Sequence, residues 1–136
     1  MTSDYAILVV DDEVPFTEIM AEILRSYGLQ TKVAHSAKEA LGLLSDGVPQ
    51  LLILDVMMPE IDGLTLMGQV KSNTRWDGIP VVIASASVLP DQRSAAFTAG
   101  ADVFLAKPFN SKQLRAALRP YVAIPDTADL LSKRGG

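Results

Sequence analysis

Short apolar runs alternate along this chain with amphipathic stretches. An apolar run without regular polar alternation is typical of a strand that helices cover on both faces of a parallel sheet. The run TKVA is the most polar one, which predicts that it forms an edge strand. The predicted strands are Ala6–Val10, Thr31–Ala34, Leu51–Leu54, Val81–Ala84 and Asp102–Leu105.

The stretches between these runs have helical spacing. Apolar residues three or four apart predict a first helix over residues 16–27, with Gly28 as its stop. A second helix begins after Ser36, which is a good N-cap with Glu39 three residues later, and ends at Asp46-Gly47. Three more helices are predicted, around residues 64–71, 92–99 and 114–121.

The order of elements is strand then helix, five times over. Right-handed helical crossovers between parallel strands give a doubly wound α/β fold, a (βα)5 domain around a five-stranded parallel sheet. We place this domain at residues 1–122, and a tail or linker that contains Pro125 at residues 123–136. Because ligands of such sheets bind outside the carboxyl ends of the strands, candidate site residues follow the strands.

Composition excludes several other classes of protein. The chain has 136 residues, of which 49% are hydrophobic, so a single core is expected. It has no cysteine, which excludes disulfides and thiolate metal sites. A net charge of -4 disfavours direct nucleic-acid binding. No apolar run is long enough to cross a membrane and the N-terminus lacks a signal-peptide pattern, so a cytoplasmic protein with no membrane contact is expected.

Charged and hydroxyl side chains follow four of the predicted strands. Carboxylates that end two neighbouring strands meet at one edge of the sheet, where like charges 4 Å apart repel by about 4 kcal/mol at an effective dielectric of 20. A cation is therefore expected among them, and oxygen ligands with an open face suit Mg²⁺. The residues at these strand ends are Asp11, Asp12, Glu13, Asp55, Ser85 and Lys107.

Each of these residues also has a purely structural interpretation. Asp11 and Asp12 could cap the first helix, and Asp55 could form a turn before Met58-Pro59. Lys107 alone would be a solvated lysine. Their shared position at the ends of strands is what favours a common site.

Four segments make the sequence recognisable. VVDDE, LLILDVMMPEIDG, VVIASAS and FLAKPF resemble, in order and spacing, the receiver domain of bacterial two-component response regulators, over about residues 5–122. The resemblance implies a flavodoxin-like strand order of 2-1-3-4-5 and a phosphoacceptor at Asp55. It also implies that Mg²⁺, or Mn²⁺, is held by Asp11, Asp12, Asp55 and the carbonyl of Met57.

The same resemblance assigns the remaining pocket residues. The Ser85 hydroxyl and Lys107 would contact the phosphoryl group, and the small Ala86 would leave room for it. Phe104 would be the aromatic residue of the switch, turning inward on phosphorylation as Ser85 is drawn to the phosphoryl group. The Lys107-Pro108 peptide bond would be cis.

By this resemblance the protein is a signalling switch and not a true enzyme, since it catalyses only its own phosphorylation and dephosphorylation. The donor would be a histidine kinase or a histidine phosphotransfer protein. The face formed by the fourth helix, the fifth strand and the fifth helix would control an output partner. A monomer or a phosphorylation-dependent dimer is expected, because Arg93 and Asp102 fit a charged dimer pattern that Ala117 interrupts. His35, the only histidine, is expected at the surface and not as the donor.

Three other functions stay open at this point. A phosphatase of the haloacid-dehalogenase type needs an aspartate two residues after its nucleophile, where this chain has Met57. A constitutive binding domain would have lost pocket groups, yet all are present. A flavodoxin-like cofactor site would need a phosphate loop after the first strand, where DDE stands instead. Met57 and Ser87 flank the pocket with little polar reach, which predicts slow self-dephosphorylation.

Overall fold

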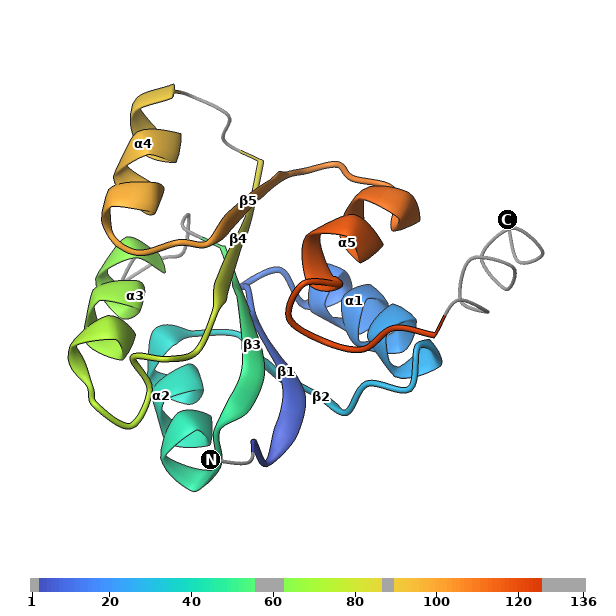
Figure 1. Ribbon diagram of the computed structural model, residues 1–136, viewed down its shortest axis with the longest axis horizontal. Helices are drawn as coiled ribbons and strands as arrows, with labels where there is room; N and C mark the ends of the chain where they lie inside the picture. The colour runs from blue at the N-terminus through green and yellow to red at the C-terminus, as the bar shows by residue number, and fades with distance from the viewer. Residues whose placement is uncertain (1–2, 56–62, 87–89, 126–136) are drawn as a thin grey trace.

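The computed structural model describes residues 3–55, 63–86 and 90–125, in which strands and helices alternate (Figure 1). The strands are β1 (Tyr5–Val10), β2 (Thr31–Ala34), β3 (Pro49–Leu54), β4 (Val81–Ser85) and β5 (Val103–Ala106). The helices are α1 (Val14–Ser26), α2 (Ala37–Asp46), α3 (Gly63–Ser72), α4 (Pro90–Thr98) and α5 (Ser111–Leu118). The five predicted strands and five predicted helices are confirmed, with ends that shift by a few residues.

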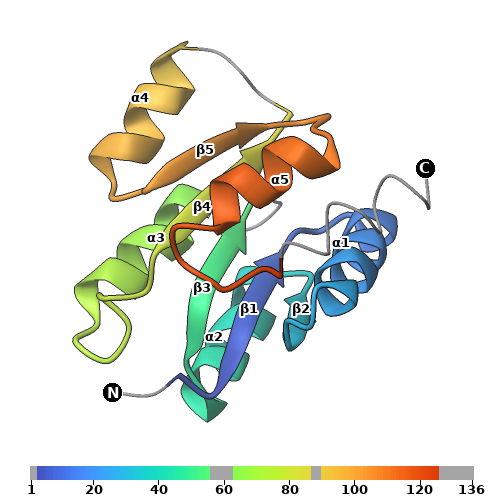
Figure 2. The ribbon, with the colours of Figure 1, turned by 45° about the vertical axis from the view of Figure 1, so that its right-hand side comes forward.

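The strands form one parallel sheet in the order β2-β1-β3-β4-β5, which confirms the doubly wound fold and its strand order. The predicted edge strand, β2, does lie at an edge. Helices α1 and α5 cover one face of the sheet, and α2, α3 and α4 lie on the other (Figures 1 and 2). The molecule is therefore a three-layer sandwich of helix, sheet and helix.

The sheet separates two apolar clusters, and its central strands contribute to both. Leu8 and Leu52 pack into the cluster beneath α2 and α3, whereas Val9 and Ile53 pack into the cluster beneath α1 and α5. Every residue of β1 and β4 is buried. This burial on both faces is why these strands read as continuous apolar runs.

The predicted helix stops and caps are largely confirmed. Gly28 and Gly100 end α1 and α4 with φ of 83° and 117°, in the left-handed region that favours glycine. The Ser36 side chain accepts a hydrogen bond of 3.1 Å from the backbone N–H of Glu39. The carboxylate of Glu39 does not return to Ser36 but accepts from the backbone N–H of His35 at 3.4 Å, so the capping box is not reciprocal.

The last helix ends earlier than its apolar spacing predicts. Helix α5 ends at Leu118, and Tyr121 lies beyond it in a turn. Pro120 has no N–H to donate to the preceding turn, which interrupts the helical ladder. The N–H groups of Tyr121 and Val122 donate instead to the carbonyl oxygen of Leu118, at 2.9 and 3.0 Å. At its start, α5 has a full capping box between Asn110 and Gln113.

Backbone hydrogen bonds join the strand ends at the carboxyl edge. The N–H of Asp55 donates to the carbonyl of Val10 at 3.0 Å, and the N–H of Lys107 donates to the carbonyl of Ser85 at 2.9 Å. The first bond joins the ends of β1 and β3, and the second joins the ends of β4 and β5. Within the described part of the chain, none of the helices is long and apolar enough to cross a membrane.

Candidate functional site

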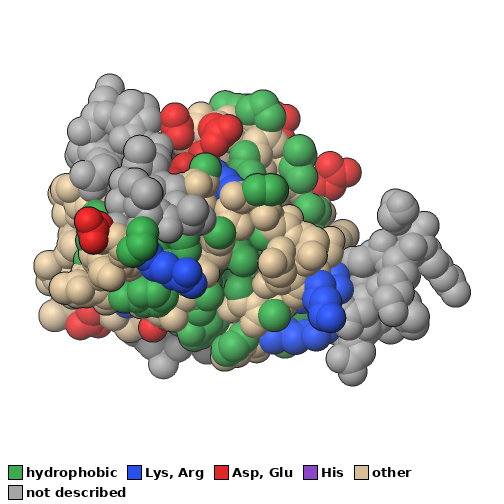
Figure 3. All heavy atoms as spheres, turned by 90° about the horizontal axis from the view of Figure 1, so that it is seen from above, with side chains coloured by type: hydrophobic (Ala, Val, Ile, Leu, Met, Phe, Trp, Pro, Cys, Tyr) green, Lys and Arg blue, Asp and Glu red, His purple; other side chains and the backbone are tan. Residues whose placement is uncertain are grey.

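Three carboxylates meet at the carboxyl edge of the sheet. Asp11 and Asp12 follow β1 and Asp55 follows β3, and one ligand oxygen from each lies within 4.8 Å of the others. Asp11 and Asp55 are only 1% and 5% exposed, whereas Asp12 is exposed to solvent. Figure 3 views the molecule from above, the side on which these strands end, and acidic side chains gather there next to hydrophobic ones.

Asp11 is held by two hydrogen bonds. Its Oδ1 accepts from the backbone N–H of Glu13 at 2.9 Å, and its Oδ2 accepts from Nζ of Lys107 at 2.6 Å. The N-cap residue of α1 is Glu13, which makes no side-chain cap bond. Asp11 therefore stabilises the start of α1 with one oxygen, while its other oxygen binds the Lys107 ammonium.

Lys107 is the cation at this edge. Its side chain is 12% exposed, and Nζ lies 3.6 Å from both Asp55 Oδ2 and Glu13 Oε1 in addition to its bond with Asp11. Burial lowers the pKa of the Lys107 ammonium, but the bond to Asp11 and the attraction of the three carboxylates outweigh it and raise that pKa above its ordinary value. Lys107 is thus not a solvated surface lysine.

One ammonium does not balance this cluster. Four carboxylates, those of Asp11, Asp12, Glu13 and Asp55, lie around or beside Lys107, which leaves a formal charge of about -3 when all are ionised. The donors are all oxygen atoms, the type that Mg²⁺ and Mn²⁺ prefer. The acidic cluster of Asp11, Asp12 and Asp55 therefore fits a divalent cation.

Ser85 and Phe104 lie on the neighbouring strands. Ser85 ends β4 fully buried, paired in register with Ala106 of β5. Phe104 is 9% exposed, and the guanidinium carbon of Arg93 lies 5.2 Å from its ring centroid. The ring is thus largely buried beneath Arg93 of α4 in this conformation, and its rotation on phosphorylation stays a prediction.

Some predicted residues cannot be compared with the structure. Met57 and Ser87 lie outside the described residues, so the metal-binding carbonyl and the two flanking side chains stay predictions. Ala86 is described and exposed. The peptide bond between Lys107 and Pro108 is cis, as predicted.

The structure also shows side-chain contacts that the sequence pattern does not predict. Phe16 was assigned to the apolar face of the first helix, yet Nζ of Lys107 lies 3.9 Å from its ring centroid. His35 is half-buried and not a free surface residue, since its Nε2 lies 2.8 Å from the hydroxyl of Thr17. Periodicity shows which face of a helix is apolar, but not which charged group from another element lies upon it.

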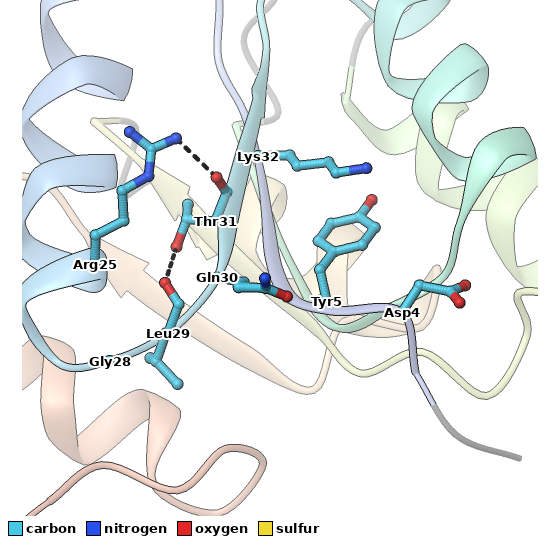
Figure 4. A pocket seen from close by; sticks show the side chains of 8 residues that line it. All are labelled: Asp4, Tyr5, Arg25, Gly28, Leu29, Gln30, Thr31 and Lys32. Carbon is cyan, nitrogen blue, oxygen red and sulfur yellow. Dashed lines mark hydrogen bonds between the residues drawn. The ribbon is translucent and has the colours of Figure 1, made fainter.

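A second hollow lies at the amino end of the sheet (Figure 4). There Nζ of Lys32 lies 4.5 Å from the ring centroid of Tyr5, and Arg25 donates to the carbonyl of Thr31 at 2.9 Å. The Tyr5 hydroxyl is buried without a hydrogen-bond partner among the described residues. Burial, with the nearby charge of Asp4, raises the pKa of Tyr5 to about 12. This hollow contains none of the strand-end carboxylates.

Comparison with known proteins agrees with the geometry of the carboxyl edge. Residues 7–119 match the family model of the response regulator receiver domain. This chain belongs to that family. The receiver domain therefore accounts for most of the chain, and the resemblance seen in the four sequence segments is confirmed.

Individual relatives support the same family. The receiver domain is 38% identical to Response regulator MprA of Mycobacterium avium over 113 residues, which are 83% of this chain and 49% of that protein. It thus spans about half the length of MprA. It is 36% identical over 123 residues to an uncharacterized 14.6 kDa protein of Leptolyngbya boryana, covering 90% of this chain and 94% of that one.

Solved structures agree on the fold. A signal receiver domain of a histidine kinase from Syntrophus aciditrophicus is 32% identical, with a TM-score of 0.79 over 86% of this chain and 89% of that one. The chemotaxis protein CheY4 of Vibrio cholerae has a TM-score of 0.82 over 87% of this chain and 98% of that one. At 24% identity, CheY4 supports the fold alone.

Proposed function

We propose that this receiver domain accepts a phosphoryl group on Asp55 and thereby switches its contact with an output partner. The observation that carries the proposal is the setting of Asp55: a buried carboxylate at the end of β3, with oxygens of Asp11 and Asp12 within 4.8 Å and the ammonium of Lys107 at 3.6 Å. A carboxylate placed beside cations is suited to attack phosphorus, since such transfer depends mostly on positioning and on stabilising charge.

The transfer step exchanges one bond to phosphorus for another. A carboxylate oxygen of Asp55 bonds to phosphorus while the bond between phosphorus and the donor nitrogen breaks. The nitrogen leaves with that electron pair and takes a proton from solvent, and Asp55 becomes an acyl phosphate. We propose a phosphohistidine of a kinase or phosphotransfer protein as the natural donor. The donor would be a separate protein, because His35 is the only histidine of this chain and contacts Thr17 and Glu39 at the end of β2.

The chain's own residues divide the remaining work. Asp11, Asp12 and Asp55, with the Met57 carbonyl, would hold Mg²⁺ or Mn²⁺, which when bound neutralises negative charge on the carboxylates and on the phosphoryl oxygens. Lys107 and the Ser85 hydroxyl would bind phosphoryl oxygens from the β5 and β4 sides. Later a water molecule would bond to phosphorus as the bond from phosphorus to the Asp55 oxygen breaks, which releases inorganic phosphate and returns Asp55 to a carboxylate.

A route from the acceptor to the output face runs along β4 and β5. The backbone of Lys107 donates to the carbonyl of Ser85, so movement of either residue is transmitted to the other. Phe104 lies three residues before Lys107 on β5, beneath Arg93 of α4. We propose that phosphorylation repacks Phe104 and Arg93 and so changes the face made of α4, β5 and α5.

This face also bears on oligomeric state. Asp102 accepts from the backbone N–H of Val81 at 2.8 Å and lies 3.9 Å from Nζ of Lys71, while Arg93 covers Phe104. Both residues of the charged dimer pattern thus have contacts inside the chain. Of the two expected states, these contacts favour the monomer.

The first experiment is intact-mass spectrometry after incubation with phosphoramidate and Mg²⁺. We expect one added phosphoryl group on the parent protein and none on Asp55→Asn, since the amide is not a nucleophile of this kind. Asp46→Asn, at the exposed end of α2, is the matched control and should be labelled like the parent. Equal labelling of Asp55→Asn would overturn the proposal.

The switch is tested by amide chemical shifts before and after phosphorylation. We expect the largest changes in α4, β5 and α5, including Phe104. Changes confined to residues 36–46 of α2 and its cap would contradict the proposed output face.

A further inference from the structure

An aromatic ring from α1 covers the ammonium of Lys107. Nζ lies 3.9 Å from the ring centroid of Phe16, close enough for an attraction between the cation and the ring face. Among the described residues, three carboxylates also lie near this ammonium: Asp11 at 2.6 Å, and Glu13 and Asp55 at 3.6 Å. The ammonium is therefore enclosed by three anions and one apolar surface.

The sequence explains how Phe16 reaches this place. Helix α1 begins at Val14, directly after the strand-end acids, so Phe16 lies in its first turn and next to the acidic edge. Its ring packs against Phe109, which follows Lys107 by two residues, with centroids 6.2 Å apart and planes at 90°. Both rings line a groove of about 500 Å³ between α1 and the segment after β5. Phe16 is thus held from two sides while its face meets the ammonium.

The ring and the carboxylates act differently on Lys107. Each carboxylate attracts the ammonium toward one fixed oxygen, and Asp11 has the shortest contact. The ring attracts the cation without offering a hydrogen-bond acceptor, and it excludes water from one side of the ammonium.

We propose that Phe16 is a positioning residue for Lys107, keeping its ammonium at the acidic edge so that it meets the phosphoryl oxygens when Asp55 is phosphorylated. The effect on phosphorylation rests on the proposed function. The placing of the Lys107 ammonium by the ring does not, because it concerns the unphosphorylated protein. Without the ring, the ammonium gains access to water and leaves the edge more often. Lys107 then binds the phosphoryl oxygens less well, and it competes less with Mg²⁺ for the carboxylate of Asp11.

These two consequences have opposite signs, which distinguishes positioning from packing. The variant Phe16→Leu should bind Mg²⁺ more tightly by about two- to fivefold, because less lysine competes for Asp11, while its phosphorylation rate at saturating Mg²⁺ falls by about the same factor, the scale of one cation–π contact. A residue that merely supports the fold would weaken both together. Phe16→Tyr and Phe16→Trp keep a ring face and should stay within about twofold of the parent.

The experiment combines calorimetric titration of Mg²⁺, phosphorylation by phosphoramidate followed by mass, and side-chain NMR of the metal-free protein. In the parent, the ε-methylene protons of Lys107 should be shifted upfield by the ring of Phe16, and Phe16→Leu should abolish this shift. Ile19→Ala is the matched control, since Ile19 lies on the same helix, lines the same groove and is exposed; it should retain the upfield shift and stay within about twofold of the parent in both measurements. An amide spectrum of each variant checks that it is folded.

Several results would overturn the inference. They are an ordinary Lys107 spectrum in the parent, a Phe16→Leu rate within twofold of the parent, a parallel loss of Mg²⁺ binding and rate, or an equal effect of Ile19→Ala. Failure of the proposed function looks different. In that case no variant is phosphorylated, while the upfield shift and the tighter Mg²⁺ binding of Phe16→Leu still support the placing of Lys107 by the ring.

Discussion

Two lysines of this receiver domain lie over aromatic rings, at opposite ends of the sheet. At the carboxyl end, Lys107 lies 3.9 Å from the ring centroid of Phe16, and at the amino end Lys32 lies 4.5 Å from that of Tyr5. Their surroundings differ: three carboxylates approach Lys107, whereas Lys32 is exposed. A cation over a ring is thus a common packing device, and the converging carboxylates are what make one end a chemical site.

The difference follows from the direction of the strands. All five strands are parallel, so the loops after β1, β3 and β5 bring Asp11, Asp55 and Lys107 to one edge. The loops at the other edge precede the strands, and there Arg25 of α1 donates a hydrogen bond to the backbone carbonyl of Thr31 at the start of β2. Both ends carry charged side chains. At the carboxyl end, the four carboxylates of Asp11, Asp12, Glu13 and Asp55 outnumber the single ammonium of Lys107.

The largest difference between the two ends should appear in the free energy of unfolding when each lysine is replaced by methionine. Lys107→Met leaves the buried carboxylate of Asp11 without its partner, and breaking a buried pair typically costs about 3 kcal/mol of unfolding free energy. Lys32→Met removes an exposed contact worth less than about 1 kcal/mol. Urea unfolding at pH 7 measures both.

Mg²⁺ sharpens this test. Because a divalent cation at Asp11, Asp12 and Asp55 would replace the lost positive charge, we expect Mg²⁺ to restore much of the stability of Lys107→Met and to leave the difference between Lys32→Met and the parent unchanged. Equal losses for the two variants, or no recovery with Mg²⁺, would show that the two ends do not differ in the way argued.

The same contrast explains how much could be predicted from sequence. The strands were predictable because burial on both faces makes a run such as Leu51–Leu54 apolar without alternation, and the site was predictable because strand ends share an edge. The length of α5 was overestimated, because apolar spacing continues to Tyr121 while Pro120 removes a backbone donor.

Contacts between elements were not predictable from spacing. The apolar pattern assigned Phe16 to the core face of its helix, yet its ring also meets a charge from β5, ninety-one positions further along the chain. Likewise Tyr5 precedes the predicted first strand and carries no motif, although its hydroxyl is one of two buried polar groups that have no partner among the described residues. Such residues are recognised only once the packing of the elements is known.

Tyr5 predicts a loss of stability in alkali that originates at the amino end. Its pKa is raised to about 12 from 10.0, so the folded state keeps the phenol proton where the unfolded chain loses it. Stability therefore falls as pH rises above 10, by up to about 3 kcal/mol for a rise of about two pKa units. Lys107, whose pKa is also raised, adds a loss that begins above the ordinary lysine value and is complete once pH passes its folded value.

Single variants separate these two contributions. Urea unfolding between pH 8 and pH 11.5 should show a shallower decline for Tyr5→Phe than for the parent. The difference in stability between Lys107→Met and the parent should narrow as pH rises above the ordinary lysine pKa, because the parent begins to lose the lysine's contribution there. A decline in Tyr5→Phe as steep as that of the parent would place the alkaline loss elsewhere.

The smallest expected effect is the change in stability that Tyr5→Phe causes at pH 7, and its sign is what matters. A buried hydroxyl without a partner costs free energy, so its removal should stabilise the protein by about 1 kcal/mol. Tyr27→Phe is the matched control, because Tyr27 is equally buried at 5% exposure but its hydroxyl accepts from Arg115 at 3.5 Å. That variant should lose about 0.5 to 1 kcal/mol. If urea unfolding gave both variants the same sign, the Tyr5 hydroxyl would be satisfied in solution, and the amino end would hold its polar groups as completely as the carboxyl end holds Lys107.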